Sequence, residues 1–115
     1  VLEASLKIRE IDYVYTIPMY SGELKHGTLS LIDKGTIVLS LNTSEDKDKI
    51  KNAINEISSR GGEVIQMETY ITRKFDCYTP IFSIIPFQLL CYDIALLNDR
   101  NPDMPRNLAK SVTVE

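Results

Sequence analysis

The chain has 115 residues, which is enough for one domain at most. Apolar residues make up 43% and charged residues 25% of it, as is typical of a water-soluble domain. The formal net charge of -3 argues against nucleic acid and anionic membrane as main partners, although a local basic pocket for a phosphate group is compatible with it.

Residues 1–15 are predicted to form a helix with its charges on one narrow stripe. At about 100° per residue, Glu3, Lys7 and Glu10 fall on this stripe, between two apolar shoulders. The simpler interpretation is an exposed Glu3–Lys7 pair that adds a few tenths of a kcal/mol. The alternative is the wall of a polar cavity. A second polar face of the same helix comprises Ser5, Arg9 and Asp12.

The helix has no preceding cap, since the sequence is helical from Val1 onward. We therefore expect the chain to be a piece of a longer polypeptide.

The middle of the chain predicts a βαβ unit with parallel strands. One or two helical turns are expected between Gly22 and Gly27. A buried strand at 35–41, a helix within 43–62 and a strand at 63–67 follow, with Ile50, Ala53, Ile54 and Ile57 on the apolar face of the helix. Two strands do not make a stable doubly wound sheet, so further strands are expected before Val1.

A long apolar helix is predicted from Thr79 and Pro80 to about Asn98, after a loop at 68–78. Pro86 is expected to kink it or to mark a restart. Polar residues interrupt its apolar run, so a buried helix fits better than a membrane span.

His26 is the only histidine of the chain. It is either structural or exposed, or a general acid or base near neutral pH that Gly27 makes approachable. A metal site is not expected, because no second His or Cys stands at ligand spacing. Cys77 and Cys91 are expected to be reduced, partly buried thiols.

Lys110 lies in a tail whose apolar residues, Leu108, Val112 and Val114, indicate packing. The alternative is a solvated terminal lysine. A partly desolvated lysine has a lowered pKa and can attack a carbonyl carbon to form a Schiff base. Glu10 could then move a proton between adjacent sugar carbons, with Lys7 keeping it ionised or holding a substrate oxygen.

Three stretches of the sequence carry a resemblance to a known family. LEASLKIREI (2–11), GELKHG (22–27) and above all PRNLAKSVTVE (105–115) closely resemble the C-terminal part of the glutamine–fructose-6-phosphate aminotransferase family. The resemblance covers nearly the whole chain and is weakest at 42–78.

The resemblance implies an α/β fold of the sugar isomerase (SIS) type, a three-layer sandwich around a parallel sheet. Residues 1–115 would be the C-terminal part of a single SIS domain, with the C-terminal tail at 101–115. The rest of the parent polypeptide would supply a first SIS domain and a glutaminase domain.

The resemblance also implies roles for particular residues. Lys110 would form a Schiff base with the open-chain ketose, and Glu10 would shuttle a proton between the first two sugar carbons. His26 would assist ring opening in the site of the neighbouring subunit. The substrate-binding residues would be Lys7, Glu3 and Ala109, and neither a metal nor another cofactor is expected.

The implied activity is the conversion of fructose 6-phosphate and glutamine to glucosamine 6-phosphate and glutamate, in a cytoplasmic homodimer. The segment alone is expected to be inactive, because it lacks the family's phosphate-binding loop. Two alternatives stay open: a non-catalytic SIS module that binds a sugar phosphate, and a fragment that only mediates dimerisation. The tail lysine argues against the first.

Overall fold

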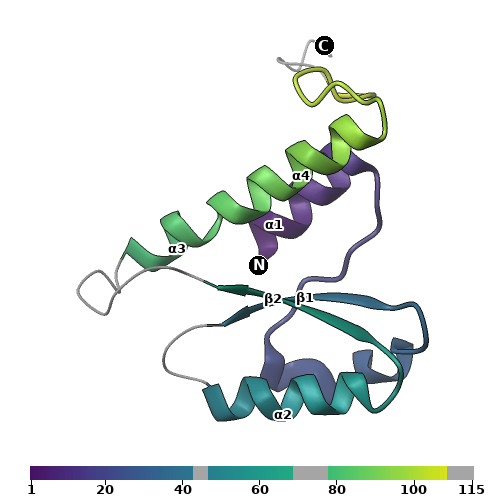
Figure 1. Cartoon of the computed structure of the whole chain (residues 1–115), viewed down its shortest axis with the longest axis vertical. Helices are drawn as coiled ribbons and strands as arrows, with labels where there is room; N and C mark the ends of the chain where they lie inside the picture. The colour runs from purple at the N-terminus through teal and green to yellow at the C-terminus, as the bar shows by residue number, and fades with distance from the viewer. Residues whose placement is uncertain (43–46, 69–77, 109–115) are drawn as a thin grey trace, which may run out of the picture.

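The computed structural model describes residues 1–42, 47–68 and 78–108. Two parallel strands form the middle layer, with one α-helix on one side and the first and last α-helices of the chain on the other (Figure 1). This arrangement confirms the predicted α/β class and its three layers. The elements, in chain order, are α1 (Leu2–Lys7), the π-helix η1 (Ile8–Asp12), the 3-10 helices η2 (Ser21–His26) and η3 (Thr28–Leu31), β1 (Ile37–Asn42), α2 (Lys47–Ser58), β2 (Glu63–Glu68), α3 (Thr79–Ser83) and α4 (Ile85–Leu97).

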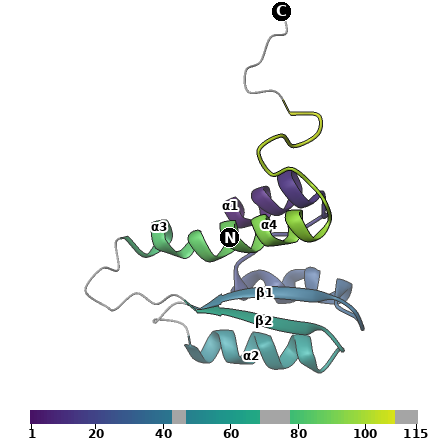
Figure 2. The same ribbon diagram turned by 45° about the horizontal axis from the view of Figure 1, so that its top comes forward.

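The two strands pair in parallel, with Ile37 opposite Glu63 and Asn42 opposite Glu68. Helix α2 forms the crossover between them and lies along one face of the sheet in both views (Figures 1 and 2). The predicted βαβ unit is therefore confirmed. The prediction of a buried strand at 35–41 was wrong in one respect, because most of β1 is only half-buried. The sheet has only these two strands among the residues that the structure describes.

Helix α2 buries Ile50 and Ile57 and ends at a pair of glycines, as predicted. The N–H of Gly62 donates to the carbonyl of Ile57 at 3.2 Å, and Gly61 adopts a left-handed φ of 87°. Both features are typical of a helix that ends at glycine. The predicted caps at Thr43 and Ser44 lie outside the described residues.

Replacement of Gly62 by Ala is expected to lower the free energy of unfolding by about 1–3 kcal/mol. A Cβ atom there would lie 2.7 Å from Cγ2 of Ile57 and 2.8 Å from Cγ2 of Ile32, so the core must shift. Gly22→Ala is the control, because its Cβ would meet no described atom within 4 Å. Urea denaturation measures both variants, and equal midpoints would contradict the expectation.

The first helix ends earlier than predicted, at Asp12 instead of residue 15. Its last turn is a π-helix, and Tyr13 then takes a left-handed conformation with φ of 57°. A bulky residue seldom adopts this conformation unless its surroundings impose it. Those surroundings come from residues 100–106, which no local pattern around Tyr13 reveals.

The apolar C-terminal segment restarts near Pro86, one of the two outcomes predicted for it. Helix α3 ends at Ser83, and α4 begins at Ile85 with Pro86 in its first turn. Proline is tolerated there because the first N–H groups of a helix have no partner within it.

Helix α4 packs against α1 and η1 along one stripe of its surface. The stripe is formed by Phe87, Cys91 and Ala95, which are four residues apart and buried. The 19 residues Thr79–Leu97 are apolar and long enough to cross a membrane by length and composition alone. The sequence predicted a buried helix. Within the described chain, α4 is buried along this stripe only, and its other side is exposed.

Candidate functional site

The charged stripe on the first helix is an ion-pair network centred on Lys7. Nζ of Lys7 lies 2.6 Å from Oε2 of Glu10 and 3.8 Å from Oε1 of Glu3. The side chains of Lys7 and Glu10 are 28% and 29% exposed, whereas Glu3 is 54% exposed. The main partner of Lys7 is thus Glu10, and the Glu3–Lys7 pair of the simpler interpretation is the looser of the two contacts.

Lys7 is held in its cationic form by this network. The hydrogen bond that Lys7 donates to Glu10 raises the pKa of Lys7, and partial burial opposes this by a smaller amount. An ammonium group beside a carboxylate can orient that carboxylate and can donate a hydrogen bond to a substrate oxygen. It cannot attack a carbonyl carbon, because its nitrogen carries no lone pair.

Glu10 lies on the π-helical turn Ile8–Asp12. π-turns are rare and occur mostly as single turns, frequently at functional sites. The chain beyond this turn folds back onto α1, where the Thr16 hydroxyl lies 2.7 Å from the Ser5 hydroxyl and donates to the Ser5 carbonyl at 3.2 Å. Glu10 is therefore fixed from both sides of the turn.

His26 lies on η2, which packs against α2, on the opposite side of the sheet from α1 (Figure 1). Its ring is 70% exposed, and Nδ1 lies 3.1 Å from Oε2 of Glu23. Next to it, Nζ of Lys25 contacts Oε1 of Glu56 on α2 at 2.7 Å. Within one chain, Glu3, Lys7 and Glu10 lie together and His26 lies apart from them. The expected role of His26 in a neighbouring subunit stays a prediction.

Lys110 and Ala109 lie outside the described residues. The described chain ends at Leu108, two residues before Lys110.

A buried polar cluster that the sequence did not predict lies on the same helical segment as the stripe. Asp12 was placed on a polar face with Ser5, yet Asp12 is 0% and Ser5 5% exposed. Neither carboxylate oxygen of Asp12 has a hydrogen-bond partner in the part of the chain that the structure describes. Cys91 on α4 adjoins it, and the Arg100 side chain donates to the Asp12 backbone carbonyl. Only the packing of α4 reveals this cluster, because a helical wheel does not show which face a distant helix covers.

Burial dominates the electrostatics of this cluster. It raises the pKa of Asp12, while the Cys91 thiol and the Arg100 guanidinium lower it by smaller amounts. Burial, followed by the charge of Asp12, raises the pKa of Cys91 to about 12. The Cys91 thiol is therefore protonated at neutral pH and is a poor nucleophile.

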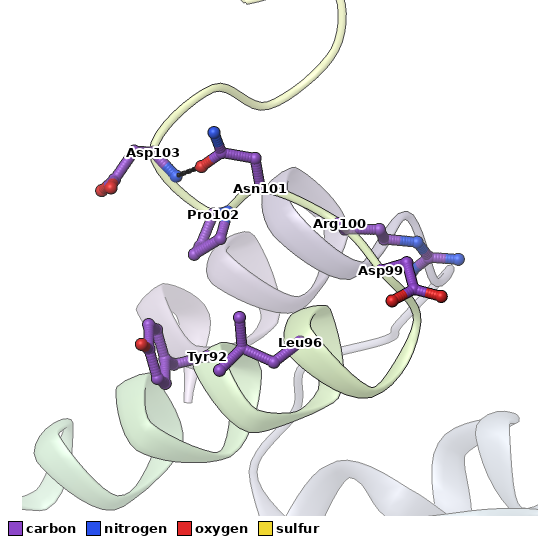
Figure 3. Close-up of a pocket in the computed structure, with 7 residues that line it drawn as sticks. All are labelled: Tyr92, Leu96, Asp99, Arg100, Asn101, Pro102 and Asp103. Carbon is purple, nitrogen blue, oxygen red and sulfur yellow. Dashed lines mark hydrogen bonds between the residues drawn. The ribbon is translucent and has the colours of Figure 1, made fainter.

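A hollow of about 500 Å³ lies where the chain leaves α4 (Figure 3). None of the residues that sequence analysis singled out as site candidates lines it. Its lining comprises Tyr92, Leu96, Asp99, Arg100, Asn101, Pro102 and Asp103. Within the described ranges, no group of three or more His, Cys, Asp or Glu side chains could hold a metal ion.

Residues 2–74 match the model of the SIS domain. The chain belongs to the SIS domain family.

The relatives of this SIS chain include glutamine–fructose-6-phosphate aminotransferases [isomerizing]. Those of Listeria innocua, Caldanaerobacter subterraneus and Encephalitozoon cuniculi are 46%, 40% and 39% identical to it, each over 99% of the chain. The chain spans 21%, 21% and 18% of the lengths of these relatives, in the order Listeria, Caldanaerobacter and Encephalitozoon. The resemblance predicted from the three sequence stretches is therefore confirmed.

Two solved structures are similar to this SIS chain. The glucosamine-6-phosphate deaminase of Thermotoga maritima has a TM-score of 0.77 and 27% identity, over 96% of this chain and 35% of its own. The C-terminal domain of the glucosamine-fructose-6-phosphate aminotransferase of Francisella tularensis has a TM-score of 0.73 and 28% identity, over 86% of this chain and 32% of its own. Both support the SIS-type fold.

Replacement of Asp12 by Asn is expected to change how stability depends on pH. Because the folded-state pKa of Asp12 is raised above 3.8, its contribution to stability is full below that pH and is lost as the pH rises through the raised pKa. Asn cannot ionise, so the variant does not lose this stability. The free energy of unfolding of the variant, relative to that of the wild type, should therefore rise toward neutral pH.

Urea denaturation at a series of pH values measures this difference. Asp93→Asn, at an exposed position on α4, is the control. A difference between Asp12→Asn and wild type that stays constant with pH would contradict the expectation.

Proposed function

We propose that this chain supplies the sugar isomerase site of a glutamine–fructose-6-phosphate aminotransferase. The parent protein would convert fructose 6-phosphate and glutamine to glucosamine 6-phosphate and glutamate. The similarity over 99% of the chain to relatives of that name supports the substrate class. The observation that carries the chemistry is the half-buried Glu10 carboxylate, held 2.6 Å from the Lys7 ammonium on a π-turn.

In the proposed reaction, the neutral amine of Lys110 attacks C2 of the open-chain ketose. A C2=N bond forms and the carbonyl oxygen leaves as water. Ammonia from glutamine then displaces Lys110 and leaves an imine at C2. Glu10 takes a proton from C1 and returns one to C2, while the C1 hydroxyl loses its proton and the imine nitrogen gains one, which gives the aldehyde at C1 and the amine at C2.

The state of Lys7 supports this division of roles. Its raised pKa keeps it charged, so it orients Glu10 and contacts substrate oxygens while the Schiff base is left to another lysine. Lys110 fits that second role by its place in the family motif NLAKS, at residues 107–111.

His26 would act from the neighbouring subunit. Its helix η2 packs against α2, which lies across the sheet from α1 (Figure 1). Its exposed ring is free to enter the site of a partner, and the Lys25–Glu56 ion pair fixes the turn that carries it on α2. The reaction would thus need a homodimer.

Borohydride reduction of the full-length polypeptide with fructose 6-phosphate tests the Schiff base. An adduct on Lys110, mapped by peptide mass spectrometry, is expected, and Lys110→Arg should abolish it because a guanidinium does not form the imine. Lys34→Arg, at an exposed turn position, is the matched control and should keep the adduct. No adduct in protein that binds the sugar would favour the non-catalytic SIS module instead.

Glu10→Gln tests the proton shuttle. The variant should still form the Lys110 adduct, but formation of glucosamine 6-phosphate and exchange of the C1 hydrogen with D2O should fall about 10²–10⁴-fold, because an amide cannot accept the proton. Asp48→Asn, exposed on α2, is the control. An unchanged exchange rate would show that another group is the base.

A further inference from the structure

Tyr13 directly follows the first helical segment, which consists of α1 and η1. It contacts residues at the start of the C-terminal tail. Its ring centroid lies 5.0 Å from Cζ of Arg100 and 4.0 Å from Cζ of Arg106. The backbone N–H of Arg106 donates to the Tyr13 hydroxyl at 2.9 Å. One residue before Tyr13, the Asp12 carbonyl accepts a hydrogen bond from the Arg100 side chain. Four contacts therefore tie residues 100–106 to residues 12 and 13.

The backbone has an unusual conformation on both sides of these contacts, at Tyr13 and next to Arg106. Tyr13 is left-handed, with φ of 57°, a conformation that a bulky residue keeps only where its surroundings determine it. Asn107 is also left-handed, with φ of 61°, directly after the residue that contacts Tyr13. The chain therefore turns at a defined place directly after its contact with Tyr13.

These four contacts, called the anchor below, lie close in the sequence to the proposed reacting groups, Glu10 and Lys110. Tyr13 follows Glu10 by three residues, and Arg106 precedes Lys110 by four. Four residues span at most about 14 Å when fully extended. An Arg106 backbone fixed on Tyr13 therefore limits how far Lys110 can move from the turn that carries Glu10.

We propose that Tyr13 is a positioning residue that holds the root of the tail, residues 100–106, on the turn that carries Glu10, and so delivers Lys110 to the sugar. The inference rests on the proposed function. Tyr13 touches neither substrate nor the reacting atoms in this role, and it acts through the arginine contacts and the hydrogen bond to Arg106. Figure 1 shows the chain leaving α4 beside the end of the first helical segment, where this anchor lies.

The test measures the rate of borohydride-trapped adduct on Lys110 in the full-length polypeptide, together with the dissociation constant for fructose 6-phosphate. Tyr13→Leu removes the ring and the hydroxyl, and should slow trapping about tenfold or more while the dissociation constant changes less than about twofold. Tyr13→Phe keeps the ring below the guanidinium groups and should restore most of the rate. Tyr15→Leu is the matched control, because Tyr15 is fully exposed in the described chain.

The outcomes separate the inference from the proposed function. If wild-type protein forms no adduct, the proposed function fails and the inference fails with it. If wild type is trapped and Tyr13→Leu is trapped at the same rate, only the inference is overturned. It is also overturned if trapping and sugar binding weaken in the same proportion, which would indicate a merely structural role.

Should Tyr13→Leu fail to fold, Arg106→Gln tests the same anchor from its other side. This variant keeps the backbone N–H that donates to Tyr13 but removes the guanidinium over the ring. Slower trapping with sugar binding retained supports the anchor, and an unchanged rate overturns it.

Discussion

The packing of the first helical segment on the last helix is the interaction on which the rest of the structure depends. Helix α4 meets α1 and η1 although the whole βαβ unit separates them in the sequence. This contact buries one face of the first helix and leaves the flank with Lys7 and Glu10 half-buried. The partial burial strengthens their ion pair, because charges interact more strongly when less water surrounds them. The same contact brings the chain after α4 back to Tyr13.

Three locally unfavourable features follow one another along this contact. Glu10 lies on a π-turn, Asp12 is a buried carboxylate without a hydrogen-bond partner among the described residues, and Tyr13 is left-handed. Burying an unpaired polar group opposes folding, and a left-handed bulky residue adds strain. Their clustering within four residues, next to the candidate base, is typical of a segment shaped by function. The apolar contacts around Phe87, Cys91 and Ala95 must offset the stability that is lost there.

The parts of the structure that the sequence predicted are those decided by local pattern. The βαβ unit follows from a β-branched run, a periodic helix and two glycines, and the break near Pro86 follows from the missing N–H of proline. The charged stripe was also predicted, because three residues on one helix face need no tertiary information. The π-turn, the burial of Ser5 and Asp12 and the left-handed Tyr13 could not be predicted, because they depend on α4 and Arg100, which are distant in the sequence.

The proposed reaction needs two lysines in opposite states of protonation, and the sequence carries them on different segments, Lys7 on α1 and Lys110 in the C-terminal tail. Lys7 sits on a helix between two carboxylates, so its charge is stabilised by 2.6 Å and 3.8 Å contacts. A Schiff-base lysine must instead be neutral when it attacks, so its amine must not be held in an ion pair as that of Lys7 is. In the sequence, no acidic residue stands between Arg106 and Val114, so Lys110 has no carboxylate among its near neighbours along the chain. The anchor on Tyr13 would thus let the two lysines serve one sugar while their amines keep different protonation states.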